Sequence, residues 1–206
     1  MYTPAHFAEA DPDEIERLIS AFPLAAVVAD TPGGLCANHL PLLLSGDRLT
    51  GHVALANAMH EEVPDGTPVL AIFRGGDAYV SPNWYPSKAE THRAVPTWNY
   101  HVVHVHGHIR WLREAAAKRR IVSLLTSRFE KPLNGESAWK MGDAPADYLE
   151  DMISKIVALE ISILRIEAKS KLNQNHPEAN RRAVAQEFAA RGADHLAAAM
   201  RRKSGE

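Results

Sequence analysis

The chain has too few cysteines to form a disulfide within itself. Its single cysteine, Cys36, lies among apolar residues, and we expect it to be a small buried side chain in a protein from a reducing compartment. The N-terminal stretch MYTPAHFAEADPDEIE lacks the basic and apolar segments of a signal peptide. No stretch approaches the ~18 consecutive apolar residues of a membrane span. These absences predict a cytoplasmic protein.

The chain also lacks an excess of charge of either sign. Its formal net charge is −2 and its pI is near 6.6, which disfavours a strongly basic nucleic-acid binder. Only two short basic clusters, 118–120 and 201–203, could face DNA. A glycine-rich dinucleotide loop, a Walker A loop and a Gly-x-Ser-x-Gly elbow are all missing. The sequence therefore assigns no catalytic residue.

What the chain does contain is a series of short apolar runs separated by turn clusters. The closely spaced turns, among them Gly75-Gly76-Asp77, predict antiparallel neighbours and a β-barrel. We expect strands over residues 24–29, 35–44, 49–55, 69–73, 78–80 and 97–112.

Helical patterns flank these runs. Asp11 is the expected N-cap of a helix ending at Phe22, with Pro12 at its first position. Further helices are predicted over 114–129, 145–156, 178–191 and 193–202, with a last strand over 157–167. The predicted organisation is one domain over residues 1–206. Residues 1–112 and 157–176 form most of its barrel, and residues 113–156 and 177–206 are mainly helical.

The stretch 78–107 concentrates aromatic side chains with polar groups. Trp84, Tyr85 and Trp98 lie there, and their indole N–H and phenol O–H groups need hydrogen-bond partners. We interpret this stretch as one wall of a ligand site.

Histidines recur on the predicted strands. His104, His106 and His108 have the i, i+2, i+4 spacing that places side chains on one face, as a metal site needs. Gly107 favours a bulge that would turn His108 away, and a half-exposed strand face is the alternative. His39 and His52 each stand near a strand end, where a satisfied core or edge histidine is the usual interpretation and a shared polar pocket is the alternative.

A polar segment, KLNQNHP, covers residues 171–177. One interpretation is a lip that presents amides to a ligand ring. The other is a capped turn, with Asn175 or His176 as the cap and Pro177 at the first position of the next helix. The residues alone leave both open.

Several long motifs then point to one family. They are Met1-Tyr2-x-Pro4-x-His6-Phe7, His39-Leu40-Pro41, Gly51-His52-Val53-Ala54 with Ala56-Asn57, Ala78-Tyr79-Val80-Ser81-Pro82, Trp84-Tyr85, Val95-Pro96-Thr97-Trp98-Asn99-Tyr100, and Lys171-Leu172 with Gln174-Asn175. The chain resembles the PaiB-like FMN-binding negative transcriptional regulators. Leu55 stands where that family usually has an arginine, and Lys88, Arg74 or Lys171 could replace the missing cation.

The resemblance implies an α+β fold, an antiparallel split β-barrel of the flavin-reductase type with flanking helices and a helical C-terminus. It also implies a homodimer with FMN at the interface. The cofactor-binding residues that it implies are His39, Leu40, Pro41, His52, Val53, Ala54, Asn57, Ser81, Trp84, Tyr85, Lys88, Thr97, Trp98, Lys171, Gln174 and Asn175.

Two other functions stay open at this point. The same barrel hosts FMN-dependent reductases and oxidases, and a fold does not decide a function. The histidines from His101 to His108 could instead hold a metal or haem.

Overall fold

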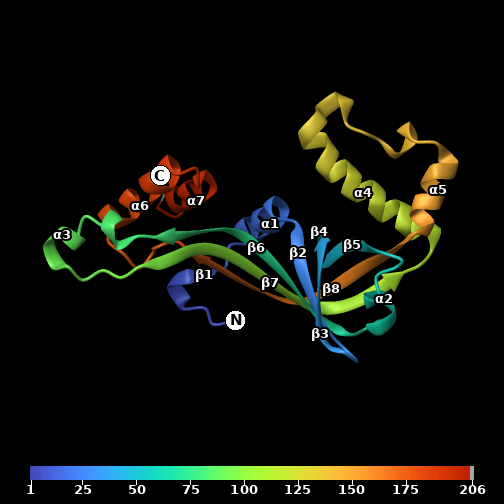
Figure 1. Cartoon of the computed structure of the whole chain (residues 1–206), viewed down its shortest axis with the longest axis horizontal. Coiled ribbons are helices and arrows are strands. Elements are labelled where there is room, and N and C mark those ends of the chain that lie inside the picture. The colour runs from blue at the N-terminus through green and yellow to red at the C-terminus, as the bar shows by residue number, and fades with distance from the viewer. Residues whose placement is uncertain (205–206) are drawn as a thin grey trace. The chain divides into compact units, whose positions relative to one another are not determined.

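Eight strands form one sheet in a computed structural model that describes residues 1–204 (Figure 1). Their order is β3-β2-β6-β7-β8-β5-β4, and β1 pairs with β8. The strands are β1 (Ala8–Glu9), β2 (Leu24–Thr31), β3 (Gly34–Pro41), β4 (Leu43–Ser45), β5 (Arg48–Ala54), β6 (Pro68–Val80), β7 (Thr97–Leu112) and β8 (Ile156–Lys171).

Seven α-helices accompany the sheet within these residues. They are α1 (Pro12–Ala21), α2 (Met59–Glu62), α3 (Lys88–Thr91), α4 (Ala115–Asn134), α5 (Ala146–Ser154), α6 (Glu178–Ala190) and α7 (Asp194–Ser204). The predicted class, an α+β chain on an antiparallel split barrel, is confirmed, and along the described residues the strand order runs open from β3 to β4. No helix among them has the length and apolarity needed to cross a membrane.

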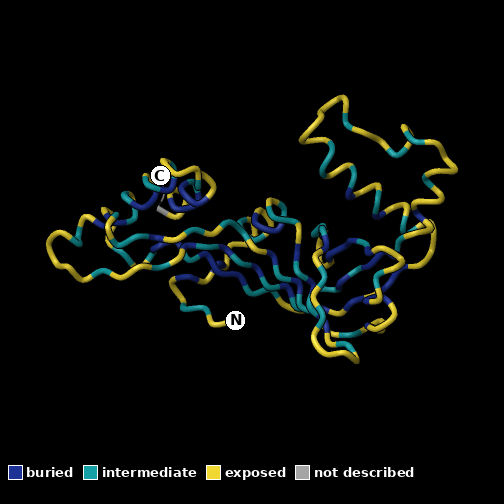
Figure 2. Tube along the Cα trace, viewed as in Figure 1, coloured by how far each residue is buried: buried dark blue, intermediate teal, exposed yellow. Residues whose placement is uncertain are grey.

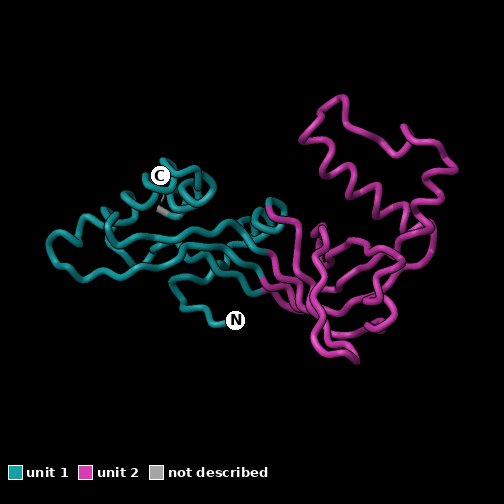
Figure 3. Tube along the Cα trace, in the orientation of Figure 1, with its two compact units in different colours: residues 1–21, 74–103, 167–206 teal, residues 22–73, 104–166 magenta. Residues whose placement is uncertain are grey.

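The chain divides into two compact units, coloured separately in Figure 3. Unit 1 contains residues 1–21, 74–103 and 167–206, and unit 2 contains residues 22–73 and 104–166. Strands β6, β7 and β8 contribute residues to both units. The single domain expected from the sequence stays a prediction, and each unit is described by itself below.

In unit 2, strand β2 shows why the short apolar runs form a sheet. Ala25, Val27 and Ala29 are buried while their neighbours along the strand are not, which is the period of two that a half-buried strand requires. Strand β2 pairs antiparallel with β3 and β6, and β5 pairs antiparallel with β4 and β8. The segment from α4 to α5 is largely exposed (Figure 2).

In unit 1, helices α6 and α7 share one apolar cluster with the last residue of β6 and the segment that follows it. Phe188, Leu196 and Met200 are buried there against Tyr85 and Val80. Helix α1 begins as predicted: the Oδ1 atom of Asp11 accepts a hydrogen bond from the Asp13 N–H at 3.0 Å.

The turn predicted at Gly75-Gly76-Asp77 is wrong, because β6 continues through it from Pro68 to Val80. These glycines permit close approach in place of a turn. A Cβ at Gly75 would lie 2.6 Å from the Cβ of His101, and one at Gly76 would overlap the imidazole of His195. From sequence alone, a glycine pair next to an aspartate looks the same whether it forms a turn or lets a strand pass close to other side chains.

Other boundaries also differ from the predictions. The alternation of burial continues through Gly107, so β7 has no break there and His104, His106 and His108 share one face. The strand predicted over 35–44 is two strands, because the Leu42 N–H leaves the ladder and donates to the Pro23 carbonyl at 2.9 Å. Helix α4 continues past the predicted end through Pro132, β8 extends to Lys171, and Cys36 is half-buried.

Candidate functional site

The residues that the resemblance implies divide between the two units. Residues 39–57 of the set belong to unit 2, and residues 81–98 and 171–175 belong to unit 1. Their joint role in cofactor binding stays a prediction. Within each unit, however, the structure shows what each side chain contacts.

In unit 2, Leu40 and Val53 are buried core residues. Strand β5 places His52 opposite Ala158 of β8. The Nδ1 atom of His52 is buried and has no hydrogen-bond partner. Burial lowers the pKa of His52, so the imidazole is neutral near pH 7.

Two asparagines tie the ends of β3 and β5 together. Asn57 donates from Nδ2 to Oδ1 of Asn38 at 2.7 Å, and its own Oδ1 accepts from the Met59 N–H at 3.0 Å. His39 and Pro41 flank this contact as half-buried or exposed strand residues. Leu55, where the resemblance leads us to expect an arginine, is 49% exposed.

In unit 1, most of the predicted aromatic wall serves the core. Tyr85 is buried, and burial raises the pKa of its hydroxyl. Trp84 meets Phe188 edge-on with 5.9 Å between ring centroids. Trp98 is 52% exposed and lies edge-on to Tyr79.

The loop after β6 forms a surface hollow of about 620 Å³ in unit 1. Ser81 accepts a hydrogen bond from the Asn83 N–H at 3.2 Å and so starts a short 3-10 turn. Lys88 donates to Oδ1 of Asn83 across the same loop. The hollow thus brings together three implied residues, Trp84, Tyr85 and Lys88, which line it with Asn83, Pro86, Ala89 and His92.

The polar segment after β8 forms a turn. Asn173 has a left-handed backbone (φ 61°) and donates to the Tyr85 hydroxyl at 2.7 Å. Gln174 accepts from the Leu172 N–H at 2.6 Å and donates to the Ser170 carbonyl, so both ends of its amide are used inside the turn. Asn175 is exposed. Helix α6 follows with Pro177 as its N-cap and without a side-chain cap from Asn175 or His176.

A pair of lysines on one face of β8 is the most unusual feature of unit 1. Lys169 is only 7% exposed, and its ammonium lies 5.7, 6.0 and 5.3 Å from the ring centroids of Tyr2, Phe7 and Tyr100. Lys171 stands two residues further on. Within residues 1–204 neither ammonium forms an ion pair with a carboxylate.

The hydrogen bonds of these lysines go to uncharged oxygens. Lys169 donates to the Tyr2 carbonyl at 3.3 Å, and Lys171 donates to Oγ1 of Thr97 and to the Trp98 carbonyl at 2.8 Å. Burial, and then the charge of Lys169, lower the pKa of Lys171. Two neighbouring cations without a carboxylate favour an anionic ligand. Sequence reasoning found Lys171 but missed Lys169, although the spacing of the two predicts a shared strand face.

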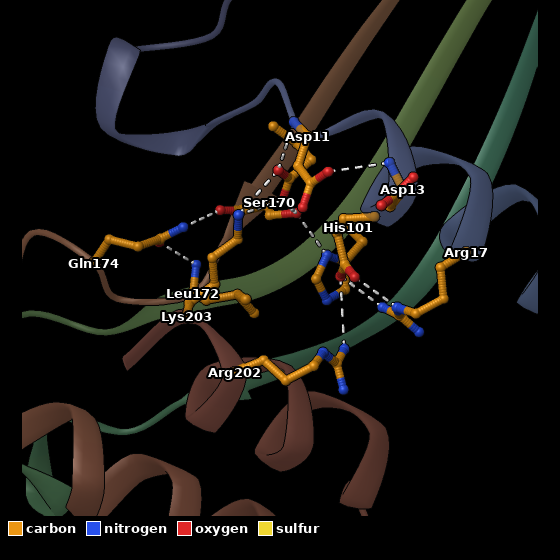
Figure 4. A network of polar contacts seen from close by, with 11 residues as sticks. Asp11, Asp13, Arg17, His101, Ser170, Leu172, Gln174, Arg202 and Lys203 are labelled. Carbon is orange, nitrogen blue, oxygen red and sulfur yellow. Dashed lines mark hydrogen bonds and ion pairs between the residues drawn. The ribbon is translucent and has the colours of Figure 1, made fainter. Parts of the chain in front are cut away.

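The opposite face of β8 carries a polar network that holds the C-terminal helix (Figure 4). Lys203 pairs with the buried carboxylate of Glu9 at 2.7 Å, and Ser170 donates to the same carboxylate at 3.1 Å. Because the Ser170 proton is used in this way, His101 donates from Nδ1 to Oγ of Ser170 at 2.9 Å. Burial is the largest cause that lowers the pKa of His101 to about 4.

Comparison with known proteins identifies the family. A family model described as "Putative FMN-binding domain" matches residues 1–165. The chain belongs to this family. It is 30% identical over 182 residues to "Protease synthase and sporulation protein PAI 2" of Bacillus subtilis, covering 86% of this chain and 84% of that protein. A protein of Emericella nidulans is 28% identical over 232 residues, covering 94% of this chain and 92% of its own length.

Solved structures share the fold at low sequence identity. A conserved protein of Mycobacterium tuberculosis has a TM-score of 0.61 at 13% identity, over 86% of this chain and 95% of its own. A flavocytochrome of Azotobacter vinelandii has a TM-score of 0.59 at 14% identity, over 80% and 69%. An FAD- and haem-binding protein of Mycobacterium smegmatis has a TM-score of 0.58 at 18% identity, over 80% and 73%. At these identities the likeness concerns the fold alone.

Proposed function

We propose that this protein binds FMN and that Lys169 and Lys171 hold the phosphate of the cofactor. The family supplies the chemical class of the ligand. The observation on this chain that carries the proposal is a pair of lysines, Lys169 buried and Lys171 half-buried, without a carboxylate partner. The family match ends at residue 165, so the assignment of Lys169 rests on the structure, whereas Lys171 also belongs to the set that the resemblance implies.

The residues present fit a phosphate monoester. Such a group carries about −1.5 to −2 charges at pH 7 and offers three acceptor oxygens. Two ammonium groups can match that charge, and the Thr97 hydroxyl beside Lys171 adds a neutral hydrogen-bonding group. The phosphate would also remove the repulsion between the lysines.

The aromatic residues around Lys169 can exclude water from the ion pairs. Phe7 is buried, and Tyr100 is half-buried on β7. A drier setting strengthens the attraction between ammonium and phosphate. When bound, the isoalloxazine ring supplies the redox chemistry, and the protein binds and orients it. We propose a homodimer with FMN at its interface as the binding form.

A role as a negative transcriptional regulator is the finer part of the proposal, and it rests on the resemblance to PaiB-like proteins. Three of the six cations in the two basic clusters already contact carboxylates. Arg120 contacts Glu160 at 3.2 Å, Arg202 contacts Glu14 at 3.6 Å, and Lys203 contacts Glu9. Because carboxylates already neutralise these cations, we expect weak direct affinity for DNA. A gel shift at low salt that gave a specific complex would show that the clusters bind DNA after all.

Titration of FMN into flavin-free protein tests the main proposal. Quenching of flavin fluorescence should saturate at one FMN per chain, and light scattering on a sizing column should give a dimer. A titration without quenching would refute flavin binding. A saturable titration of a monomer would refute only the dimer.

A further inference from the structure

A cavity of about 410 Å³ lies in unit 2 between helix α4 and the strands β4 and β5, and its volume is within the range of small-molecule pockets. Its apolar lining comes from Leu43 and Leu44 of β4 and from Leu124 and Pro132 of α4. The two β4 leucines are half-buried, and Leu124 is 48% exposed. A short hydrocarbon chain that packed here would remove apolar surface from water.

Two cations stand at the open side of this cavity. Arg128 and Lys131 occupy the i and i+3 positions on one face of α4, and both side chains are exposed. Within residues 1–204 neither forms an ion pair with a carboxylate. The acid between them in sequence, Glu130, accepts instead from Nδ2 of Asn134 at 2.8 Å and from the Trp139 N–H at 3.0 Å. Two neighbouring cations favour an anionic ligand, which would relieve their repulsion.

A mostly buried hydroxyl belongs to the same lining. Thr50 is 6% exposed and lines the cavity from β5. Its hydroxyl forms no hydrogen bond within the described residues, and it is not one of their enclosed unpaired polar atoms, so the oxygen keeps accessible surface. Polar groups at such buried positions usually have a partner. The Thr50 hydroxyl is therefore a donor that a ligand in the cavity can use.

The carboxylate nearest to this hydroxyl on the sheet is already neutralised. Glu160 of β8 lies opposite Thr50 in the ladder between β5 and β8. Its Oε1 accepts from Arg120 at 3.2 Å, and its Oε2 accepts from Arg48 at 3.1 Å. Because Glu160 has these two cations of its own, Arg128 and Lys131 stay available to a ligand.

We propose that this cavity binds a small amphipathic anion, an aliphatic chain that ends in a carboxylate. Arg128 and Lys131 meet the charge of the carboxylate, and the guanidinium fork offers it paired N–H donors. The Thr50 hydroxyl donates to a carboxylate oxygen, and the leucines contact the chain. None of these residues belongs to the set implied for the flavin, so the site goes beyond the proposed binding of FMN.

Octanoate and octanamide form the test pair, because the amide keeps the chain and the shape of the head group but removes its charge. Isothermal titration at low salt should give an affinity for octanoate roughly fivefold higher than for octanamide, the effect of two exposed ion pairs. In R128M/K131M this preference should vanish while octanamide still binds. In T50V, which keeps the shape of the side chain, both probes should bind about fivefold more weakly, because each loses one neutral hydrogen bond.

The variant R119M is the matched control, because Arg119 is another exposed cation of α4 that lies outside this cavity. It should bind both probes like the wild type, and circular dichroism should show all variants folded. Equal affinities of the two probes for the wild type would overturn the proposal. A preference for octanoate that survives in R128M/K131M would overturn it too, as would the absence of binding. Unchanged affinities in T50V would overturn the role of Thr50. Each outcome is independent of whether FMN binds.

Discussion

The two units differ in what they bury. Seven buried polar or charged residues lie in unit 1, and two, Thr50 and His60, lie in unit 2 among the residues that the structure describes. The seven are Glu9, Asn99, His101, Lys169, Ser170, Asn173 and Asn180. Unit 2 instead contains a largely apolar cavity beside α5.

This difference indicates which unit holds a buried, unpaired charge. A buried charge is costly unless it is paired. In unit 1 the Glu9 carboxylate meets Lys203 and Ser170, whereas Lys169 has no such counter-ion. The unpaired cation is therefore the basis of the proposed anion site.

The largest expected effect concerns the buried imidazole of unit 1. The folded pKa of His101, about 4, lies below the usual histidine value of 6.5. Between these pH values the unfolded state binds more protons, so stability rises with pH and is lost as the pH falls from 6.5 towards 4. This one group contributes about 3 kcal/mol over that range. In H101N, urea unfolding at pH 7 and pH 4 should show a difference smaller by about that amount.

An unchanged pH dependence in H101N would mean that folding does not lower the pKa of His101. The Asn side chain can keep a hydrogen bond to Ser170, so a loss of the fold is not expected. The buried histidine of unit 2 has a different kind of partner: Nε2 of His60 bonds to the Leu55 backbone carbonyl at 2.8 Å, whereas His101 bonds to a serine hydroxyl.

The next effect is steric and belongs to unit 2. A Cβ at Gly107 would lie 2.3 Å from the Ser162 carbonyl oxygen, a backbone atom that cannot move without disturbing the ladder. G107A should therefore lower the free energy of unfolding by about 2 kcal/mol, measured by urea denaturation. In G142A, where no atom lies within 4 Å of the added Cβ, the change should be near zero.

A smaller effect is expected from the tether of the C-terminal helix in unit 1. K203M leaves the buried carboxylate of Glu9 with Ser170 and the Asp11 N–H as partners. Because the Lys203 side chain is about one-third exposed, we discount the full cost of a broken buried pair to about 1–2 kcal/mol. Chemical denaturation would measure it, and a neutral outcome would place the Glu9–Lys203 pair among ordinary surface contacts.

The smallest effect is shared by both units. Arg202 contacts Glu14 at 3.6 Å in unit 1, and Arg120 contacts Glu160 at 3.2 Å in unit 2, both from exposed side chains. R202M and R120M should each cost about 0.5 kcal/mol or less, and less still in high salt. A salt-independent loss above 1 kcal/mol in either variant would show that its pair is structurally important.

The sequence predicts those parts of the fold that depend on residues close together in the chain. The short apolar run of β2 and the Asp11-Pro12 start of α1 are local signals, and both are confirmed. The Gly75-Gly76 pair was misread because its partners, His101 and His195, are distant in sequence. A local pattern cannot report a close approach made by the tertiary fold.

The same limit applies to the candidate site. Lys169 looks like an ordinary strand lysine, because its burial depends on the rings of Tyr2 and Phe7 at the other end of the chain. Gln174 looks available to a ligand until the turn after β8 uses both ends of its amide. The aromatic motif around Tyr85 was found from sequence, but its contacts with α6 and α7 were not.

The most direct test of the lysine pair compares FMN with riboflavin, which lacks the phosphate. Fluorescence titrations should show that the wild type binds FMN more tightly, and that K169M/K171M loses at least about tenfold in FMN affinity, the effect of a lost charge-assisted hydrogen bond. Riboflavin affinity should hardly change. K155M, which removes an exposed lysine paired with Asp151 in unit 2, should bind both flavins like the wild type. If the wild type binds the two flavins equally, or if the double variant keeps its preference for FMN, Lys169 and Lys171 do not hold the phosphate.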